Sequence, residues 1–246
     1  MAKKSIPIAT AKILYANSAG LCCICRTEVV IKTAKDGLKQ IGEMAHIAGE
    51  NEGSARYDDM MTAEQRYSYD NLILLCPNCH TTIDSAPESY SVSALKAYKQ
   101  KHEAYIKTQL VQFAQNTSFA ELEVLLNYVA INSLATNEDL TLVTPKEKIQ
   151  LNSLENVSSY IEIGLLKSST VADYLNRHPD LRFSRTIKGK FTSKYNDLKN
   201  SGMESEAIFF ELWDFAANGS QDFALRAAGL AILIYLFEIC EVFEKC

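Results

Sequence analysis

Four cysteines fall into two pairs, and their thiolates are ligands that a tetrahedral zinc site prefers. Two residues separate the members of each pair, and the second pair runs directly into a histidine. The four cysteines are Cys22, Cys25, Cys76 and Cys79. Because each tight turn can offer two sulfurs to one ion, the spacing predicts a structural zinc that joins segments about fifty residues apart. Cys23 lies inside the first pair, but Cys22 and Cys25 have the better spacing for a shared ion.

A second group of residues has the types that bind a divalent cation. His46, Asn71 and His80 occur in this order, and Asp84 follows His80 by four residues. On a helix, side chains at this spacing share one face, so His80 and Asp84 can project toward one ion. Two interpretations of Arg56 stay open. Its guanidinium could grip two phosphate oxygens as a substrate-binding residue, or it could order its own loop through a salt bridge.

Short strands and a helix must position these residues. The apolar patterns predict strands at residues 29–32, 39–46 and 71–75, so that His46 ends one strand and Asn71 begins another. A helix at residues 80–84 follows the second cysteine pair, and Pro87 ends it. Residues 8–19 are expected to form a helix before the first pair, and apolar residues recur at helical steps over residues 95–113.

The rest of the chain has the pattern of a helical domain. A polar break at residues 115–118 is the predicted boundary, which gives domains at residues 1–115 and 116–246. Beyond the break, one short strand is expected at residues 140–143. Helices are expected at residues 119–132, 146–166, 168–177, 184–200, 203–217 and 221–244. The predicted fold class is α+β, with a small mixed domain followed by a mainly α-helical one.

Charge and composition limit the classes of protein that fit. The formal net charge is −5, which is not typical of a protein that coats nucleic acid, but residues 1–112 carry 13 Lys/Arg against 12 Asp/Glu. The remainder carries 12 against 18, so DNA is expected at the first domain and protein at the second. Seven cysteines and no signal peptide at the start predict a cytoplasmic protein. The longest apolar run has eleven residues, whereas a membrane span needs about twenty.

The order of a strand histidine, an asparagine and a helix histidine resembles the HNH endonuclease family, whose active site is a ββα-metal unit. The segments that resemble the family are residues 42–47 (GEMAHI), 53–56 (GSAR) and 70–80 (DNLILLCPNCH), followed by Ile83 and Asp84. Lys99, with His102 and Glu103, is similar to the trailing helix of the family. The resemblance covers roughly residues 10–110 and is specific because these elements occur together and in order.

This resemblance implies a DNA endonuclease that needs Mg²⁺ or Mn²⁺, with the zinc as scaffold. His46 would be the general base that takes a proton from the attacking water. Asn71 would hold the loop that follows His46 or orient its ring. His80 and Asp84 would bind the catalytic cation. One position departs from the family: many members place Asp or His directly before the catalytic histidine, where this chain has Ala45.

The ligand set of the cation therefore stays open, with Glu43 as a further candidate two residues before Ala45. A nuclease module fused to a helical part also resembles bacterial anti-phage defence effectors. Residues 144–149 and 237–243 are faintly similar to effectors that work with an ABC- or SMC-type ATPase. The apolar last helix is expected to be either ordinary core or a homo-oligomer seam. The rival interpretation is a non-catalytic zinc-ribbon adaptor that binds DNA or protein, for which the four cysteines alone would suffice.

Overall fold

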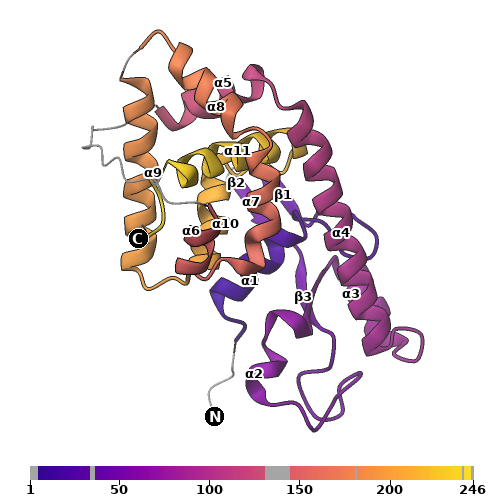
Figure 1. Ribbon diagram of the computed structural model, residues 1–246. Coiled ribbons are helices and arrows are strands. Elements are labelled where there is room, and N and C mark those ends of the chain that lie inside the picture. Colours follow the sequence, from indigo (N-terminus) through magenta and orange to yellow (C-terminus); the bar gives the residue numbers. More distant parts are fainter. Residues whose placement is uncertain (1–4, 34–36, 131–144, 181, 240, 245–246) are drawn as a thin grey trace. The chain divides into compact units, whose positions relative to one another are not determined.

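The computed structural model describes residues 5–33, 37–130, 145–180, 182–239 and 241–244 (Figure 1). The chain divides into two compact units, Met1–Ile106 and Lys107–Cys246, which we call the N-terminal and the C-terminal unit. The division falls inside one long helix, α4 (Val92–Asn116). The predicted domain boundary at residues 115–116 lies near the other end of this helix. Whether the two predicted domains fold independently stays a prediction.

The N-terminal unit begins with helix α1 (Ile8–Asn17) and contains two separate two-stranded sheets. Strands β1 (Val30–Thr33) and β2 (Gly37–Gln40) form an antiparallel hairpin. Strand β3 (Glu43–His46) pairs antiparallel with β4 (Leu72–Leu75), so that His46 lies opposite Leu72. All four residues of β4 are fully buried and form the centre of this unit's core.

The single strand predicted at residues 39–46 is in fact the two strands β2 and β3, because local contacts turn the chain between them. The amide nitrogens of Ile41 and Gly42 both donate to the carbonyl oxygen of Val29, at 2.8 and 3.2 Å. The Tyr15 hydroxyl donates to the carbonyl oxygen of Gly42 at 2.9 Å. A Cβ atom on Gly42 would lie 2.9 Å from the Tyr15 hydroxyl oxygen, so this close approach requires glycine.

Helix α3 (Pro77–Ser85) follows β4 directly. Cys76 is its N-cap, with the sulfur accepting from the amide of Cys79, and Pro77 takes the first helical position, where no backbone donor is needed. Between β3 and β4, α2 (Ala63–Arg66) begins with a reciprocal capping box of Thr62 and Gln65, and the 3₁₀ turn η1 (Tyr69–Asn71) follows it. The order β3, β4, α3 is the predicted ββα arrangement.

Two polar residues of α4 fix its first half within the N-terminal unit. The Nε2 atom of His102 lies 3.1 Å from the carbonyl oxygen of Ser18, just after α1. The ammonium of Lys99 donates to the carbonyl oxygen of Tyr69 and lies 3.4 Å from the centre of the Tyr69 ring. Both side chains are buried, so this part of α4 is the trailing helix that the sequence predicts.

The described part of the C-terminal unit is helical, in agreement with the predicted fold class. After α4, its elements are α5 (Phe119–Ala130), α6 (Pro145–Leu151), the 3₁₀ turn η2 (Glu155–Val157), α7 (Ser158–Leu165), α8 (Ser168–Arg177), α9 (Phe183–Asn200), α10 (Ser205–Ala216) and α11 (Phe223–Glu238). The predicted helix over residues 146–166 is two helices, and the strand predicted at residues 140–143 lies outside the described residues.

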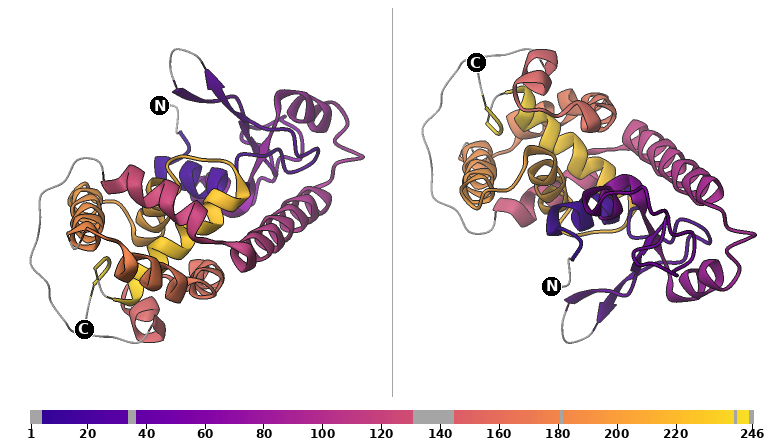
Figure 2. Two further views of the ribbon diagram at one scale, coloured as in Figure 1. Left: turned by 90° about the horizontal axis from the view of Figure 1, so that it is seen from above. Right: turned by 90° about the horizontal axis from the view of Figure 1, so that it is seen from below.

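Helix α11 is the centre of the C-terminal unit (Figure 2). It packs against α5, α7, α8 and α10, and apart from Arg226 its buried residues are all apolar, as expected for a helix in a core. Gly164 allows α7 to approach closely, since a Cβ atom there would lie 2.3 Å from Cγ1 of Ile234. Within the described parts of the chain, none of the helices combines the length and apolar character that a membrane span needs.

Candidate functional site

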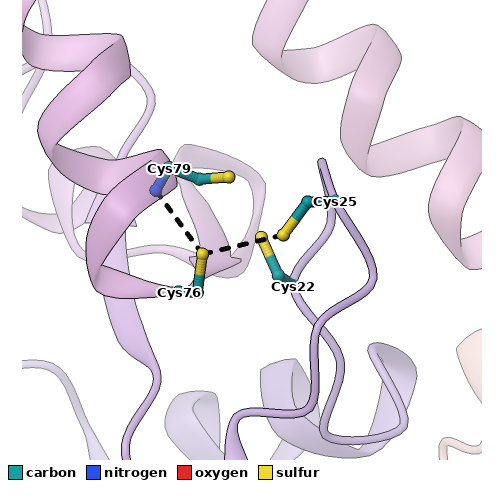
Figure 3. Close-up of side chains that lie close together, drawn as sticks. All are labelled: Cys22, Cys25, Cys76 and Cys79. Carbon is teal, nitrogen blue, oxygen red and sulfur yellow. Dashed lines mark hydrogen bonds between the residues drawn. The ribbon is translucent and has the colours of Figure 1, made fainter.

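The four predicted cysteines come together in the N-terminal unit (Figure 3). Their sulfur atoms all lie within 4.8 Å of one another, and those of Cys25 and Cys76 are 3.7 Å apart. Zinc–sulfur bonds of about 2.3 Å in a tetrahedron put neighbouring sulfurs about 3.8 Å apart, so the four thiolates fit one zinc ion. This cluster indicates a structural zinc site, and the clustering predicted from the spacing is confirmed.

Cys23 is not part of the cluster, although it is the neighbour of Cys22. Its sulfur lies 3.6 Å from the hydroxyl oxygen of Ser18, and its amide donates to the carbonyl oxygen of Leu74 at 2.9 Å. Burial raises the pKa of the Cys23 thiol to about 11, because an apolar environment disfavours the thiolate. Cys23 is therefore a core residue of the N-terminal unit.

His46 and His80 line one pocket, with a volume of about 390 Å³. The pocket is formed by β3, the loop after it, the first turn of α3 and the start of the chain. Its other lining residues are Ser5, Ile6, Met44, Ala45, Glu50 and Tyr67. The strand histidine and the helix histidine, which are 34 positions apart in the sequence, can thus reach the same bound molecule.

The imidazole of His46 has an unusual environment. Its Nε2 atom is buried and has no hydrogen-bond partner among the described residues, and the ring of Tyr67 lies edge-on at 5.5 Å. Burial lowers the pKa of His46, since the charged imidazolium loses solvation. A buried, unpartnered nitrogen costs stability and is typical of functional sites. A neutral ring of this kind can accept a proton from a molecule in the pocket.

Asn71 holds the backbone that follows His46. Its side-chain oxygen accepts from the amide of Ala48 at 2.9 Å, and its nitrogen donates to the carbonyl oxygens of Ala48 and Arg66, both at 3.0 Å. Its own carbonyl oxygen accepts from the amide of Ile47 at 2.8 Å. Of the two roles that the resemblance implies for Asn71, this geometry fits the holding of the loop rather than contact with the ring.

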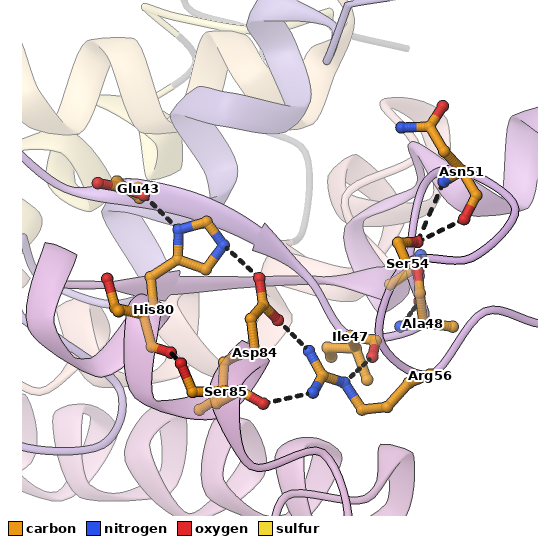
Figure 4. A network of polar contacts seen from close by, with 12 residues as sticks. Glu43, Ile47, Ala48, Asn51, Ser54, Arg56, His80, Asp84 and Ser85 are labelled. Carbon is orange, nitrogen blue, oxygen red and sulfur yellow. Dashed lines mark hydrogen bonds and ion pairs between the residues drawn. The ribbon is translucent and has the colours of Figure 1, made fainter.

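His80 lies between two carboxylates that come from different elements (Figure 4). On α3, its Nε2 atom is 3.3 Å from Oδ2 of Asp84, so the two side chains share a helix face as predicted. From β3, an oxygen of Glu43 contacts the other ring nitrogen, Nδ1. Ligands at about 2.1 Å in an octahedral Mg²⁺ site are about 3.0 Å from their neighbours. The Nε2 and Oδ2 atoms therefore fit adjacent positions on one small cation.

Each of the three guanidinium nitrogens of Arg56 donates a hydrogen bond within the protein. Its Nε atom donates to the carbonyl oxygen of Ile47 at 2.8 Å, and Nη1 donates to that of Ile83 at 2.7 Å. Its Nη2 atom pairs with Oδ1 of Asp84 at 2.7 Å, and only 5% of the side chain is exposed. This geometry fits the loop-ordering alternative better than a phosphate clamp, since all three nitrogens already have acceptors.

Two lining residues of the pocket had no signal in the sequence. The hydroxyl of Tyr67 donates to Oε1 of Glu50 at 2.5 Å, and this pair lies next to His46. Arg66 is buried and fixes the loop that begins at Gly49, because its Nη1 atom donates to the carbonyl oxygen of Gly49 at 2.8 Å. These contacts depend on the path of residues 49–62 between β3 and α2, which no periodic pattern describes.

A ββα unit with one histidine on the strand and another on the helix, facing a common pocket, defines the class of ββα-metal nucleases. Residues 46–85 match the HNH endonuclease family, a segment that begins at His46 and ends just beyond Asp84. Residues 46–85 of the chain therefore form an HNH endonuclease domain, and HNH nucleases are metal-dependent enzymes that act on DNA. No curated protein matches the chain.

Proposed function

We propose that the protein is a DNA endonuclease in which His46 is the general base and His80 and Asp84 hold a Mg²⁺ or Mn²⁺ ion. The observation that carries this proposal is the shared pocket of His46 and His80. In this pocket the buried Nε2 atom of His46 has no hydrogen-bond partner among the described residues. The pocket also contains His80, which pairs with Asp84 at the spacing of two metal ligands.

Each residue of the site has its own role in phosphodiester hydrolysis. His46 takes the proton from the water that attacks phosphorus, and its lowered pKa keeps the ring neutral and able to do so. Asn71 keeps the backbone next to His46 in place. When bound at His80 and Asp84, the cation would stabilise the charge that develops on the phosphate and the leaving oxygen. The zinc at the four cysteines is scaffold.

Cleavage of supercoiled plasmid DNA with added Mg²⁺ or Mn²⁺ tests this function. We expect the zinc-loaded protein to cut, and His46→Ala to cut about 10²–10⁴-fold more slowly, the usual loss on removal of a general base. Zinc content must be equal in the two proteins, so that scaffold damage is excluded. Equal rates would show that His46 is not the base, whereas binding of DNA without cutting by either protein would favour the zinc-ribbon adaptor.

We further propose that the C-terminal unit connects the nuclease to a protein partner in anti-phage defence. Support comes from the resemblance of the fused architecture to such effectors and from the excess of acidic residues beyond residue 112, which disfavours DNA. Purification of the tagged protein from its native cells tests the partner. Recovery with an ABC- or SMC-type ATPase is the expected result, and recovery without one would contradict the proposal.

A further inference from the structure

His80 and Asp84 each contact a further charged side chain, Glu43 and Arg56 respectively. Glu43 contacts Nδ1 of His80, on the side of the ring away from Asp84. Arg56 donates to Oδ1 of Asp84, so that Oδ2 is the oxygen directed toward Nε2 of His80. Each member of the pair thus has one polar atom fixed by a protein neighbour and one polar atom left for the cation (Figure 4).

Two cation positions are conceivable around His80, beside Nε2 with Asp84 or beside Nδ1 with Glu43. The first is anchored better. Asp84 is tied to Arg56, and Arg56 is itself fixed by two backbone carbonyl oxygens and is almost completely buried. Glu43 is the first residue of the four-residue strand β3, 45% of its side chain is exposed, and it contacts His80.

We propose that Glu43 and Arg56 are positioning residues for the catalytic cation, which the proposed function places at His80 and Asp84. By accepting a hydrogen bond from Nδ1–H, Glu43 selects the tautomer of His80 that leaves the lone pair of Nε2 free for the metal. A carboxylate behind a metal-binding histidine also orients the ring and makes it a stronger ligand. Glu43 therefore acts through His80 and is not a ligand itself.

Arg56 has a second consequence for the site. It connects the carbonyl oxygen of Ile47, the neighbour of His46, with both the backbone and the side chain of the α3 end at Ile83 and Asp84. One buried side chain therefore joins the strand that carries the base to the helix that carries the ligands. Since Ala45 supplies no ligand, the cation relies on two protein atoms, and their alignment matters correspondingly more.

The first measurement is the tautomer of His80 in full-length, zinc-loaded protein saturated with Mg²⁺. Long-range proton–nitrogen NMR spectra of the ¹⁵N-histidine-labelled protein distinguish the two ring nitrogens, and the chain has only four histidines to assign. We expect a protonated Nδ1 and a metal-bound Nε2 at His80. A protonated Nε2 would overturn the proposal, because it would put the cation on the side of Glu43 and make that residue a ligand.

The second measurement is Mn²⁺ affinity, followed by electron paramagnetic resonance. We expect Glu43→Gln and Arg56→Lys each to weaken Mn²⁺ binding by about 10–100-fold, the usual effect of removing such a supporting contact. Glu88→Gln is the matched control, because it removes the same charge from an exposed position outside the pocket and should leave affinity unchanged.

The outcomes separate this inference from the proposed function. If the parent binds Mn²⁺ and the Glu43→Gln and Arg56→Lys variants bind it equally tightly, the cation site is supported but the positioning role is overturned. Parent protein that binds no Mn²⁺ at all contradicts the cation site and the positioning role together. Because Glu43 is half exposed, Glu43→Gln should keep the melting temperature of the parent, so a lower affinity cannot be attributed to unfolding.

Discussion

At the scale of single residues, the state of His46 decides whether the site can work as a base. Its ring is partly buried against Tyr67, and desolvation is the largest influence on its pKa. Four ionisable neighbours modify this effect: Glu50 and Asp84 raise the pKa, and His80 and Arg66 lower it. The balance is a pKa below the ordinary value of 6.5, so the ring is neutral at neutral pH.

This balance predicts the acid side of the pH–rate profile. Since only neutral His46 can accept a proton, single-turnover cleavage should fall as pH drops through the lowered pKa, with a midpoint below 6.5. Glu50→Gln removes the largest influence that raises this pKa, so it should move the midpoint lower still. A midpoint above 6.5 in the parent protein, or a shift to higher pH in Glu50→Gln, would contradict the assignment of the base.

At the scale of elements, the cysteine cluster joins two parts of the chain that also share one hydrophobic core. Cys22 and Cys25 lie in the turn between α1 and β1, and Cys76 and Cys79 lie at the beginning of α3. The helix that carries His80 and Asp84 therefore starts at the zinc site. Strands of four residues bury little surface, so the metal is expected to supply much of the stability of this unit.

Substituting one cysteine at a time should distinguish the zinc ligands from a cysteine that is only buried in the core. We expect Cys76→Ser to lose most of the single zinc ion per chain and to unfold the N-terminal unit, with loss of cleavage. Cys23→Ser is the matched control, because it changes a buried cysteine outside the cluster and should keep its zinc. Zinc content by mass spectrometry and near-ultraviolet circular dichroism report the two effects. Full zinc in Cys76→Ser, or zinc loss in Cys23→Ser, would contradict the ligand assignment.

Elements with a strong local signal could be predicted from the sequence. The turns of the cysteine pairs, the apolar run of β4 and the proline at the start of α3 all mark their places. Breaks that depend on distant contacts could not be predicted. The helix expected over residues 146–166 ends because Asn152 bonds to the carbonyl oxygens of Lys148 and Glu244 and Ser153 adopts a φ of 53°. The partner at Glu244 is 92 positions away.

The same distinction applies to the site. A motif with fixed spacing marks His46, Asn71, His80 and Asp84, because their order follows the ββα connection. The side of His80 on which Glu43 lies depends on how β3 pairs with β4, and the three contacts of Arg56 depend on its loop. Spacing along the chain carries no information about either arrangement.

At the scale of the whole molecule, charge sets a condition for binding DNA. The net charge is −5, and carboxylates at Glu43, Glu50 and Asp84 lie in or beside the pocket. A phosphate group that approaches these groups is repelled unless a cation neutralises them. Binding of the metal and binding of DNA should therefore favour each other.

Calcium ions allow this coupling to be measured without cleavage, if Ca²⁺ occupies the site without supporting hydrolysis. By fluorescence anisotropy at constant ionic strength, we expect Ca²⁺ to strengthen DNA binding by about tenfold or more, the scale of one or two nearby charges at a partly solvated surface. Asp84→Asn should remove most of this gain. An equal gain in Asp84→Asn would mean that Ca²⁺ acts elsewhere, and no gain in the parent would contradict the coupling.

The most direct measurement is anomalous X-ray diffraction from crystals of the zinc-loaded protein soaked in Mn²⁺, with data collected at the absorption edges of both metals. The account predicts two separate peaks. Zinc should lie among the sulfurs of Cys22, Cys25, Cys76 and Cys79, and manganese should lie beside Nε2 of His80 and Oδ2 of Asp84, within the pocket that His46 faces. Manganese bound only outside that pocket, or zinc away from the four sulfurs, would contradict it.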